Sequence, residues 1–339
     1  MHHFEPNQLE KTIIATLAYG EVKKWPMTFW EIFRYLINPG RIDKKPKNHI
    51  IHKKIDFESM HKSLDVLQKQ GIVGEEDGFY FLKKANFGAT ILKTRIKQDK
   101  IADEKIKKIV HIAKYLQVFP WTKGFFLSGS LVFGWARPES DIDLLIVVKA
   151  GHIWTVRFFL SGLLFLLRLK RSNQNIQDRL CLNHFIGDQS LKIPLYSLYN
   201  AATYARLVPL YIDEGVLMNF FKRNSWVKQY LAWGYGKYFD DLRRQKKSFL
   251  QKLCNDIIET LFWFIGLGSS LENILSALQI RHIKKDPLIY KKGGRIVASK
   301  MQIEFHPKSP EKKMLEGYNN NLESLNLFDF EREKDSGLI

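Results

Sequence analysis

The sequence contains only two cysteines, Cys181 and Cys254, among its 339 residues. A disulfide framework needs several cysteine pairs, and a zinc site built from cysteines needs more ligands in close pairs. Both are excluded, and we expect a reducing compartment. The N-terminus also lacks the charged start, apolar run and cleavage site of a secretion signal, so we expect a cytoplasmic protein.

Long apolar runs without charge are also scarce. Residues 153–169 are mostly apolar, but they are fewer than the ~20 that a membrane-spanning helix needs. Residues 261–280 are long enough, but Glu272 and Asn273 lie inside them, and an ionisable group in hydrocarbon costs roughly 2.5 kcal/mol or more. We therefore do not expect a membrane partner. The interpretation of the aromatic-rich helices in residues 226–280 as a membrane-surface or homo-oligomer interface stays open.

Acidic residues are outnumbered, because 35 Asp and Glu face 53 Lys and Arg, a formal net charge of +18. The positive electrostatic potential that results favours binding to phosphate-bearing partners or to an anionic membrane. The basic residues gather in residues 41–54, 168–171 and 243–247 and in a predicted hairpin around Gly293-Gly294. That hairpin is a candidate RNA-binding or acceptor-binding patch, although a solvated turn explains it equally well.

The first 84 residues predict three helices and a β-hairpin, an arrangement that resembles a winged helix. Asp56 is the expected N-cap of the third helix, and Gly71 its C-terminal stop. The hairpin tip is acidic, with Glu75, Glu76 and Asp77 in a row, and phosphate would repel it. Protein interaction is therefore favoured over DNA binding for this module.

A second domain is expected after Pro120, where a helix over residues 102–117 ends. The pattern predicts strand 125–127, a short helix within 128–136, strand 142–148, helix 153–169 and strand 179–186. It then predicts helices over 195–207, 216–221, 226–238 and 249–282, a hairpin pairing 288–290 with 296–297, and a frayed polar C-terminus.

The informative motif lies between the first two strands of this domain. Gly129 and Ser130 follow a strand and open a helical turn, where backbone N–H groups can hold a phosphate. Ten residues later, Asp141 and Asp143 alternate along a strand and therefore project from the same face. Aligned carboxylates beside a phosphate site are the arrangement that Mg²⁺ chemistry on a nucleoside triphosphate needs.

Gly129-Ser130, a ten-residue spacer and Asp141-Ile142-Asp143 on a strand resemble the nucleotidyltransferase superfamily of the DNA polymerase beta type. The Gly134, Arg137 and Ser140 run resembles its minimal branch, and the resemblance covers roughly residues 120–190. It implies transfer of a nucleoside monophosphate from a triphosphate, with ATP favoured, to a hydroxyl of an RNA, protein or small-molecule acceptor. Pyrophosphate is released, and Mg²⁺ or Mn²⁺ is required.

The resemblance also implies roles for single residues. Gly129 and Ser130 would bind the phosphates, whereas Asp141 and Asp143 would be the catalytic metal ligands. Arg137 and Ser140 lie beside them in the sequence and would contact phosphate oxygens, although a surface role for Arg137 fits equally well.

The sequence departs from the family at the third carboxylate, which the family places on a following strand. Here the middle of that strand holds Asn183, while Asp178 and Asp188 flank it, so all three are candidates for the third group. His184 is a further candidate base, although a lone histidine in an apolar strand is more often structural. A second interpretation is therefore a catalytically weakened nucleotide-binding, regulatory or interaction protein.

The predicted fold class is α+β: a small mixed-sheet nucleotidyltransferase domain with an N-terminal winged-helix-like domain and a C-terminal helical region. The expected segments are a winged-helix-like module at 1–84, a helical linker at 85–119, the nucleotidyltransferase core at 120–192, a helical accessory domain at 193–284, and a basic hairpin with a polar tail at 285–339.

Overall fold

The computed structural model describes residues 4–42, 55–85, 89–117, 119–172, 174–235, 245, 247–264, 267–287, 294–307 and 309–337. Much of the predicted basic sequence lies outside these ranges, including residues 43–54, most of 243–247, and the first strand and turn of the predicted hairpin around Gly293-Gly294. The elements that are described mix α-helices with two β-sheets, which confirms the α+β class.

The N-terminal part has the predicted order of three helices followed by a hairpin. They are α1 (Gln8–Glu21), α2 (Phe29–Arg34), α3 (Phe57–Lys69), β2 (Val73–Glu76) and β3 (Phe79–Leu82). A two-residue strand, β1 (Met27–Thr28), adds to β3 and gives the sheet order β1-β3-β2. As predicted, Asp56 caps α3 by accepting a hydrogen bond from the Ser59 N–H.

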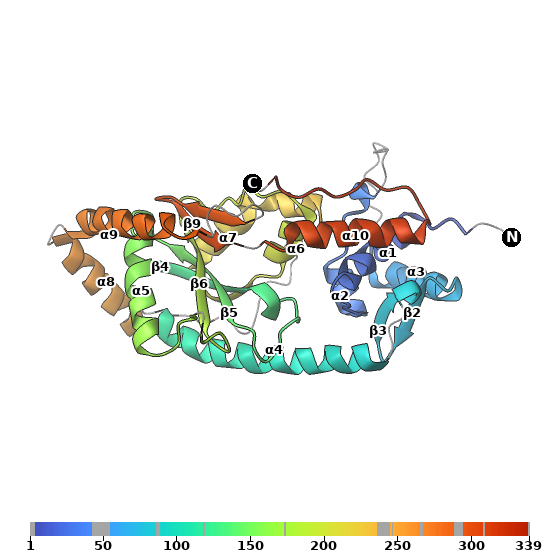
Figure 1. The fold of residues 1–339 in the computed structure, drawn as a ribbon, viewed down its shortest axis with the longest axis horizontal. Coiled ribbons are helices and arrows are strands. Elements are labelled where there is room, and N and C mark those ends of the chain that lie inside the picture. Colours follow the sequence, from blue (N-terminus) through green and yellow to red (C-terminus); the bar gives the residue numbers. More distant parts are fainter. Residues whose placement is uncertain are drawn as a thin grey trace.

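A single long helix, α4 (Ala89–Leu116), runs from this N-terminal part to the central sheet (Figure 1). The sequence predicted only its second half, because the regular apolar stripe begins at Ala102. The preceding residues are helical and contact the N-terminal part, since Arg95 pairs with Glu31 and its guanidinium lies 3.6 Å from the centroid of the Trp25 ring.

The central sheet has six strands in the order β7-β4-β5-β6-β9-β8. They are β4 (Thr122–Ser128), β5 (Ile142–Val148), β6 (Leu180–Gly187), β7 (Val208–Ile212), β8 (Arg295–Ala298) and β9 (Gln302–His306). Only β5 and β6 run parallel, joined by the crossover helix α5 (Ile153–Leu166), and the other neighbours are antiparallel.

Each face of the sheet is covered by a different set of elements. Leu145 and Val147 of β5 belong to a core shared with α1, α6 (Leu198–Ala205) and α10 (Glu311–Leu325). Leu144 and Ile146 belong to a second core with α4, α5 and α9 (Leu267–Lys284). This alternation explains why β5 is apolar almost throughout, since both of its faces are buried.

Several expectations for the C-terminal half are wrong. A strand, β7, follows α6 where the sequence predicted only helices, and residues 225–229 form a short 3-10 helix instead of part of a longer α-helix. The predicted hairpin of 288–290 with 296–297 falls largely outside the described residues; within them, β8 pairs with β9 in a hairpin that the sequence did not predict, and β9 joins β6. The C-terminal segment is not frayed within residues 309–337, because α10 packs on α1 with Tyr318 edge-on to Tyr19 at 6.1 Å, and Nδ2 of Asn319 donates a hydrogen bond to the carbonyl of Glu333 at 2.9 Å.

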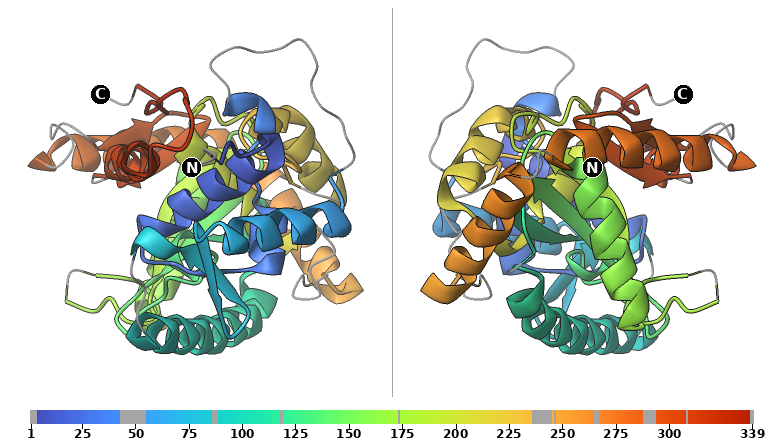
Figure 2. Two further views of the ribbon diagram at one scale, coloured as in Figure 1. Left: turned by 90° about the vertical axis from the view of Figure 1, so that its right-hand side faces the viewer. Right: turned by 90° about the vertical axis from the view of Figure 1, so that its left-hand side faces the viewer.

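The remaining helices are α7 (Glu214–Arg223) and α8 (Phe249–Phe264), and α9 begins at Leu267, so the predicted break at the glycines falls partly on residues outside the described ranges. Helices α5, α8 and α9 lie together at the end of the molecule opposite the N-terminal part (Figure 1, Figure 2). α8 exposes the side chains of Leu250, Leu253, Ile257, Leu261 and Phe264. Among the described helices, none combines the length and the apolar character needed to cross a membrane.

Candidate metal and nucleotide site

The two halves of the predicted motif meet at the end of the β4–β5 pair. Ser128, the last residue of β4, is the register partner of Asp143 on β5. Gly129 follows with a φ of +71°, a conformation that favours glycine. A Cβ atom built on Gly129 would lie 2.2 Å from Oδ2 of Asp143, so only glycine allows the turn to lie directly against this carboxylate.

Asp141, Asp143 and Cys181 form a compact cluster, and one ligand atom from each lies within 4.8 Å of the others. Cys181 is the register partner of Asp143 on the parallel strand β6. Arg171 lies across the cluster, with its Nη1 2.8 Å from Oδ2 of Asp141 and 3.3 Å from Sγ of Cys181. The guanidinium therefore provides positive charge to the two carboxylates.

The positive charge of Arg171 does not fully offset the free-energy cost of holding the carboxylates of Asp141 and Asp143 close together. Burial, followed by the negative charge of Asp141, raises the pKa of Asp143 to about 6. Burial and the charge of Asp143 likewise raise the pKa of Cys181 to about 12, so its thiol is protonated near neutral pH. The cluster is therefore short of positive charge.

A divalent cation fits this donor set. Mg²⁺ prefers oxygen ligands and typically takes one or two carboxylates, and Asp141 and Asp143 would hold it here. When bound, the ion would supply charge for triphosphate oxygens and would lower the pKa of a nearby hydroxyl. Arg171, now paired with Asp141, would then be available for another anion.

The Gly129–Ser130 turn, which the sequence predicted to bind phosphate, differs from the expectation in one respect. The predicted helix within residues 128–136 is a single 3-10 turn, Gly129–Leu131, so no long helix dipole points at the site. The Ser140 hydroxyl accepts a hydrogen bond from the Arg137 N–H at 2.9 Å and closes the turn that leads to Asp141. Ser140 thus has a structural contact as well as its predicted place beside the carboxylates.

The three candidates for the third group lie in different places. Asn183 is in the site, because its Nδ2 lies 3.3 Å from Oδ1 of Asp143. Asp178 instead forms ion pairs of 2.6 Å with Lys105 and Lys108 of α4. Asp188 accepts a hydrogen bond from the Ala150 N–H at the opposite end of β5, about 15–20 Å along the strand by its rise per residue.

The structure also brings residues to the site that the sequence did not indicate. Nδ2 of Asn183 lies 3.4 Å from Nδ1 of His306 on β9, and Nε2 of His306 lies 3.4 Å from Oε1 of Glu304. Glu304 is completely buried and forms an ion pair with Arg295 of β8. Polar side chains thus cross the sheet from β5 to β8.

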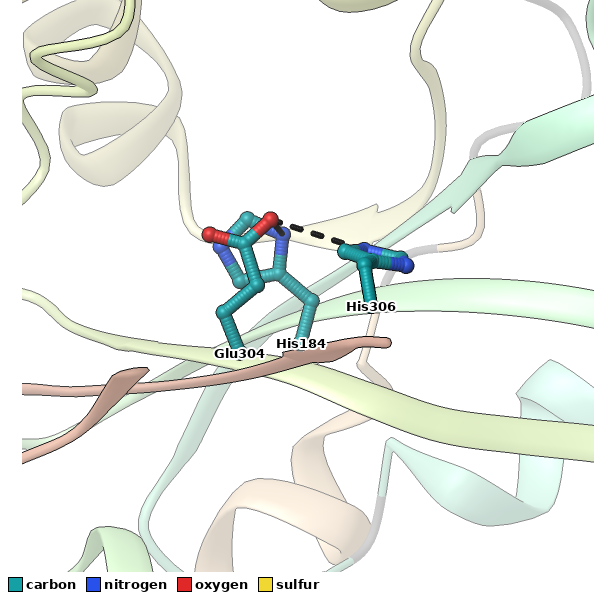
Figure 3. Close-up of side chains that lie close together, drawn as sticks. All are labelled: His184, Glu304 and His306. Atoms are coloured by element: carbon teal, nitrogen blue, oxygen red, sulfur yellow. Dashed lines mark ion pairs between the residues drawn. The ribbon is translucent and has the colours of Figure 1, made fainter. Parts of the chain in front are cut away.

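Figure 3 shows His184, Glu304 and His306 side by side, and one ligand atom from each lies within 4.8 Å of the others. Burial lowers the pKa of His306 to about 4 and that of His184 well below its ordinary value, so both are neutral at physiological pH. Arg295 already neutralises Glu304, so we interpret this cluster as a buried ion pair with two histidine neighbours.

Comparison with known proteins adds no family to these observations. Neither a scan of protein-family models nor searches of curated proteins and of solved structures found a match to this chain. The chemistry of the site is therefore inferred from its own residues.

Proposed function

We propose that the chain is a metal-dependent nucleotidyltransferase of the DNA polymerase beta type. The observation that supports this most strongly is the contact between the Gly129 turn and the carboxylate of Asp143, which joins both halves of the motif in one site. The raised pKa of Asp143 adds support, because a carboxylate pair short of positive charge is suited to a cation.

In this proposal the Gly129–Ser130 turn binds the triphosphate, and Asp141 and Asp143 hold Mg²⁺ or Mn²⁺. Arg171 exchanges its contact with Asp141 for a contact with a phosphate oxygen. The planar guanidinium can donate two parallel hydrogen bonds to either a carboxylate or a phosphate, so its geometry fits both groups. The acceptor is a hydroxyl of an RNA, a protein or a small molecule. The N-terminal three helices and hairpin act as a winged-helix-like interaction module.

The test is incubation of purified protein with labelled triphosphates, Mg²⁺ or Mn²⁺, and pools of RNA, protein and metabolites. We expect transfer of the nucleoside monophosphate, lost in Asp143→Asn and Gly129→Ala. Asp188→Asn is the matched control, because this aspartate follows the neighbouring strand β6, lies by the end of β5 far from Asp143, and should leave transfer unchanged. Equal transfer in wild type and Asp143→Asn would contradict the proposal.

The position of Asn183 favours a second candidate function, a nucleotide-binding regulator with little or no turnover. Asn183 contacts Asp143 where the family has a carboxylate, and an amide cannot accept the proton of an acceptor hydroxyl. Asn183→Asp discriminates between the two candidates. A gain of transfer in this variant, with wild type binding nucleotide but forming no product, would favour the regulator.

A further inference from the structure

A cavity of about 930 Å³ lies beside the candidate site but is separate from it. Its walls come from the N-terminal helices, α4, α6 and the loop Leu131–Trp135, which directly follows the Gly129–Ser130 turn. Neither Asp141 nor Asp143 lines it. Cavities of this size between packed segments are the usual place for a small ligand.

Flat aromatic side chains form much of the lining. The Trp135 ring stacks on Phe133 at a centroid distance of 4.3 Å and lies edge-on to Trp25 at 6.3 Å. Tyr35 lines another wall. Such a lining suits a planar ring, because aromatic rings gain energy from stacked and edge-on contacts beyond the burial of their area.

Arg206 also lines this cavity and lacks an ion-pair partner among the described residues. Its guanidinium lies 3.5 Å from the centroid of the Tyr35 ring and 4.7 Å from that of Phe133. Nη1 of Arg206 donates a hydrogen bond to the carbonyl of Ala202, at 3.0 Å. A guanidinium has five N–H donors, so most of its hydrogen-bonding capacity is unused by the protein.

Two further donors in the lining are buried and have no acceptor among the residues that the structure describes, the hydroxyl of Tyr19 and Nε1 of Trp135. Buried polar groups in folded proteins are nearly always hydrogen-bonded, and leaving one unpaired is unfavourable. Together with Arg206, these groups offer donors that a ligand with acceptor atoms would satisfy.

The other charges of the cavity are largely accounted for. Arg95 pairs with Glu31, at 2.6 Å, and with Asp99. Arg34 and Asp103 are exposed. Arg206 is therefore the half-buried charge that lacks an ion-pair partner among the described residues of the lining.

We propose that this cavity binds a small organic anion with a flat aromatic ring, with the ring against Trp135 and Phe133 and the acidic group at Arg206. A nucleoside monophosphate and an aromatic carboxylate share this chemistry. The inference does not depend on the proposed function, because the motif carboxylates take no part in it. Binding would act on the Gly129–Ser130 turn through the loop Leu131–Trp135.

Isothermal titration calorimetry of the full chain with AMP, GMP and 4-hydroxybenzoate tests this. We expect saturable binding, weakened at least about tenfold by Arg206→Leu, because a charge-assisted hydrogen bond contributes roughly that much. Trp135→Phe keeps a ring but removes the N–H and should weaken binding a few-fold. The probe that binds most tightly shows whether the ligand is a nucleoside monophosphate or an aromatic carboxylate.

Arg223→Leu on α7 is the matched control, because it removes an exposed arginine outside the cavity and should leave binding unchanged. Binding that survives Asp143→Asn but not Arg206→Leu supports the cavity even if no nucleotide transfer is found. No saturable binding of any probe, equal binding in the Arg206 variant, or loss of binding in Asp143→Asn would overturn it. If Arg206→Leu does not fold, Trp135→Phe takes its place. Binding weakened a few-fold in Trp135→Phe then supports the proposal, and unchanged binding overturns it.

Discussion

Asp143 lies within a cluster whose charges are only partly balanced. Its carboxylate is beside that of Asp141, and Arg171 and Asn183 offset only part of the resulting cost. Because its pKa is raised in the folded protein, to about 6 from 3.8, the folded state binds the proton more tightly than the unfolded state does. The stability that this group contributes is present below about pH 4 and is lost as the pH rises through about 6.

Asp143→Asn should therefore stabilise the protein near neutral pH. The amide removes a buried negative charge, and we expect the free energy of unfolding to rise by about 3 kcal/mol, since the pKa is raised from 3.8 to about 6 and each pKa unit corresponds to about 1.4 kcal/mol. Near pH 4 the difference between variant and wild type should shrink, because the wild-type carboxyl is then protonated in the folded state and about half protonated in the unfolded state. Urea unfolding at the two pH values measures this, and a variant less stable than wild type at neutral pH would refute it.

At the scale of single helices and strands, helix α5 depends on helix α9 to cap its N-terminus. Its own N-cap residue, His152, makes no capping side-chain bond. The carboxylate of Glu272 on α9 instead accepts hydrogen bonds from the backbone N–H groups of Trp154, at 3.0 Å, and Thr155, at 2.8 Å. A negative charge is favourable at this end of a helix, so the acidic residue that interrupts an apolar helix has a structural function.

Glu272→Ala should lower the free energy of unfolding by about 2–3 kcal/mol, because two buried N–H groups lose their acceptor. Glu272→Gln keeps one acceptor oxygen and should cost less. Asn273→Ala, at the exposed neighbouring position, is the control and should change stability little. Chemical denaturation compares the three variants, and an unchanged midpoint for Glu272→Ala would show that the capping contact is unimportant.

Across the whole molecule, α4 connects the N-terminal part to the candidate site. Arg95 in its first half pairs with Glu31 of α2. Lys105 in its second half is buried, and its Nζ lies 2.7 Å from the carbonyl oxygen of Ser140 and 2.6 Å from Asp178. One helix thus holds both the N-terminal part and the loop that leads to Asp141.

Lys105→Met should destabilise the protein by about 3 kcal/mol, since it removes a buried ammonium and leaves its part-buried acceptors without their charged donor. It should also weaken nucleotide binding at the candidate site by displacing the loop before Asp141. Lys108→Met also loses a contact with Asp178, but Lys108 is 57% exposed, so the cost should stay under about 1 kcal/mol. Thermal unfolding and nucleotide titration of both variants check this, and equal effects would contradict it.

Local patterns in the sequence were enough to predict the N-terminal helices, the N-cap of the third helix and the hairpin, because helical spacing, a capping Asp and turn residues act over a few positions. The strand pair that carries Asp141 and Asp143 was also predictable, since alternation fixes which side chains share a face. The proximity of Gly129 to Asp143 followed from the motif, and the geometry agrees. The activity itself stays a proposal.

Tertiary structure alone decided which strands are neighbours. β9 pairs with β6 although the paired residues His184 and Glu304 are far apart in the sequence, and no local pattern encodes that choice. It also separated Asn183, which contacts Asp143, from Asp178 and Asp188, which face α4 and the far end of β5. The physical reason is that the hydrophobic effect is non-directional. The sequence determines which residues are buried, but the packing of the whole chain decides which other residues they contact.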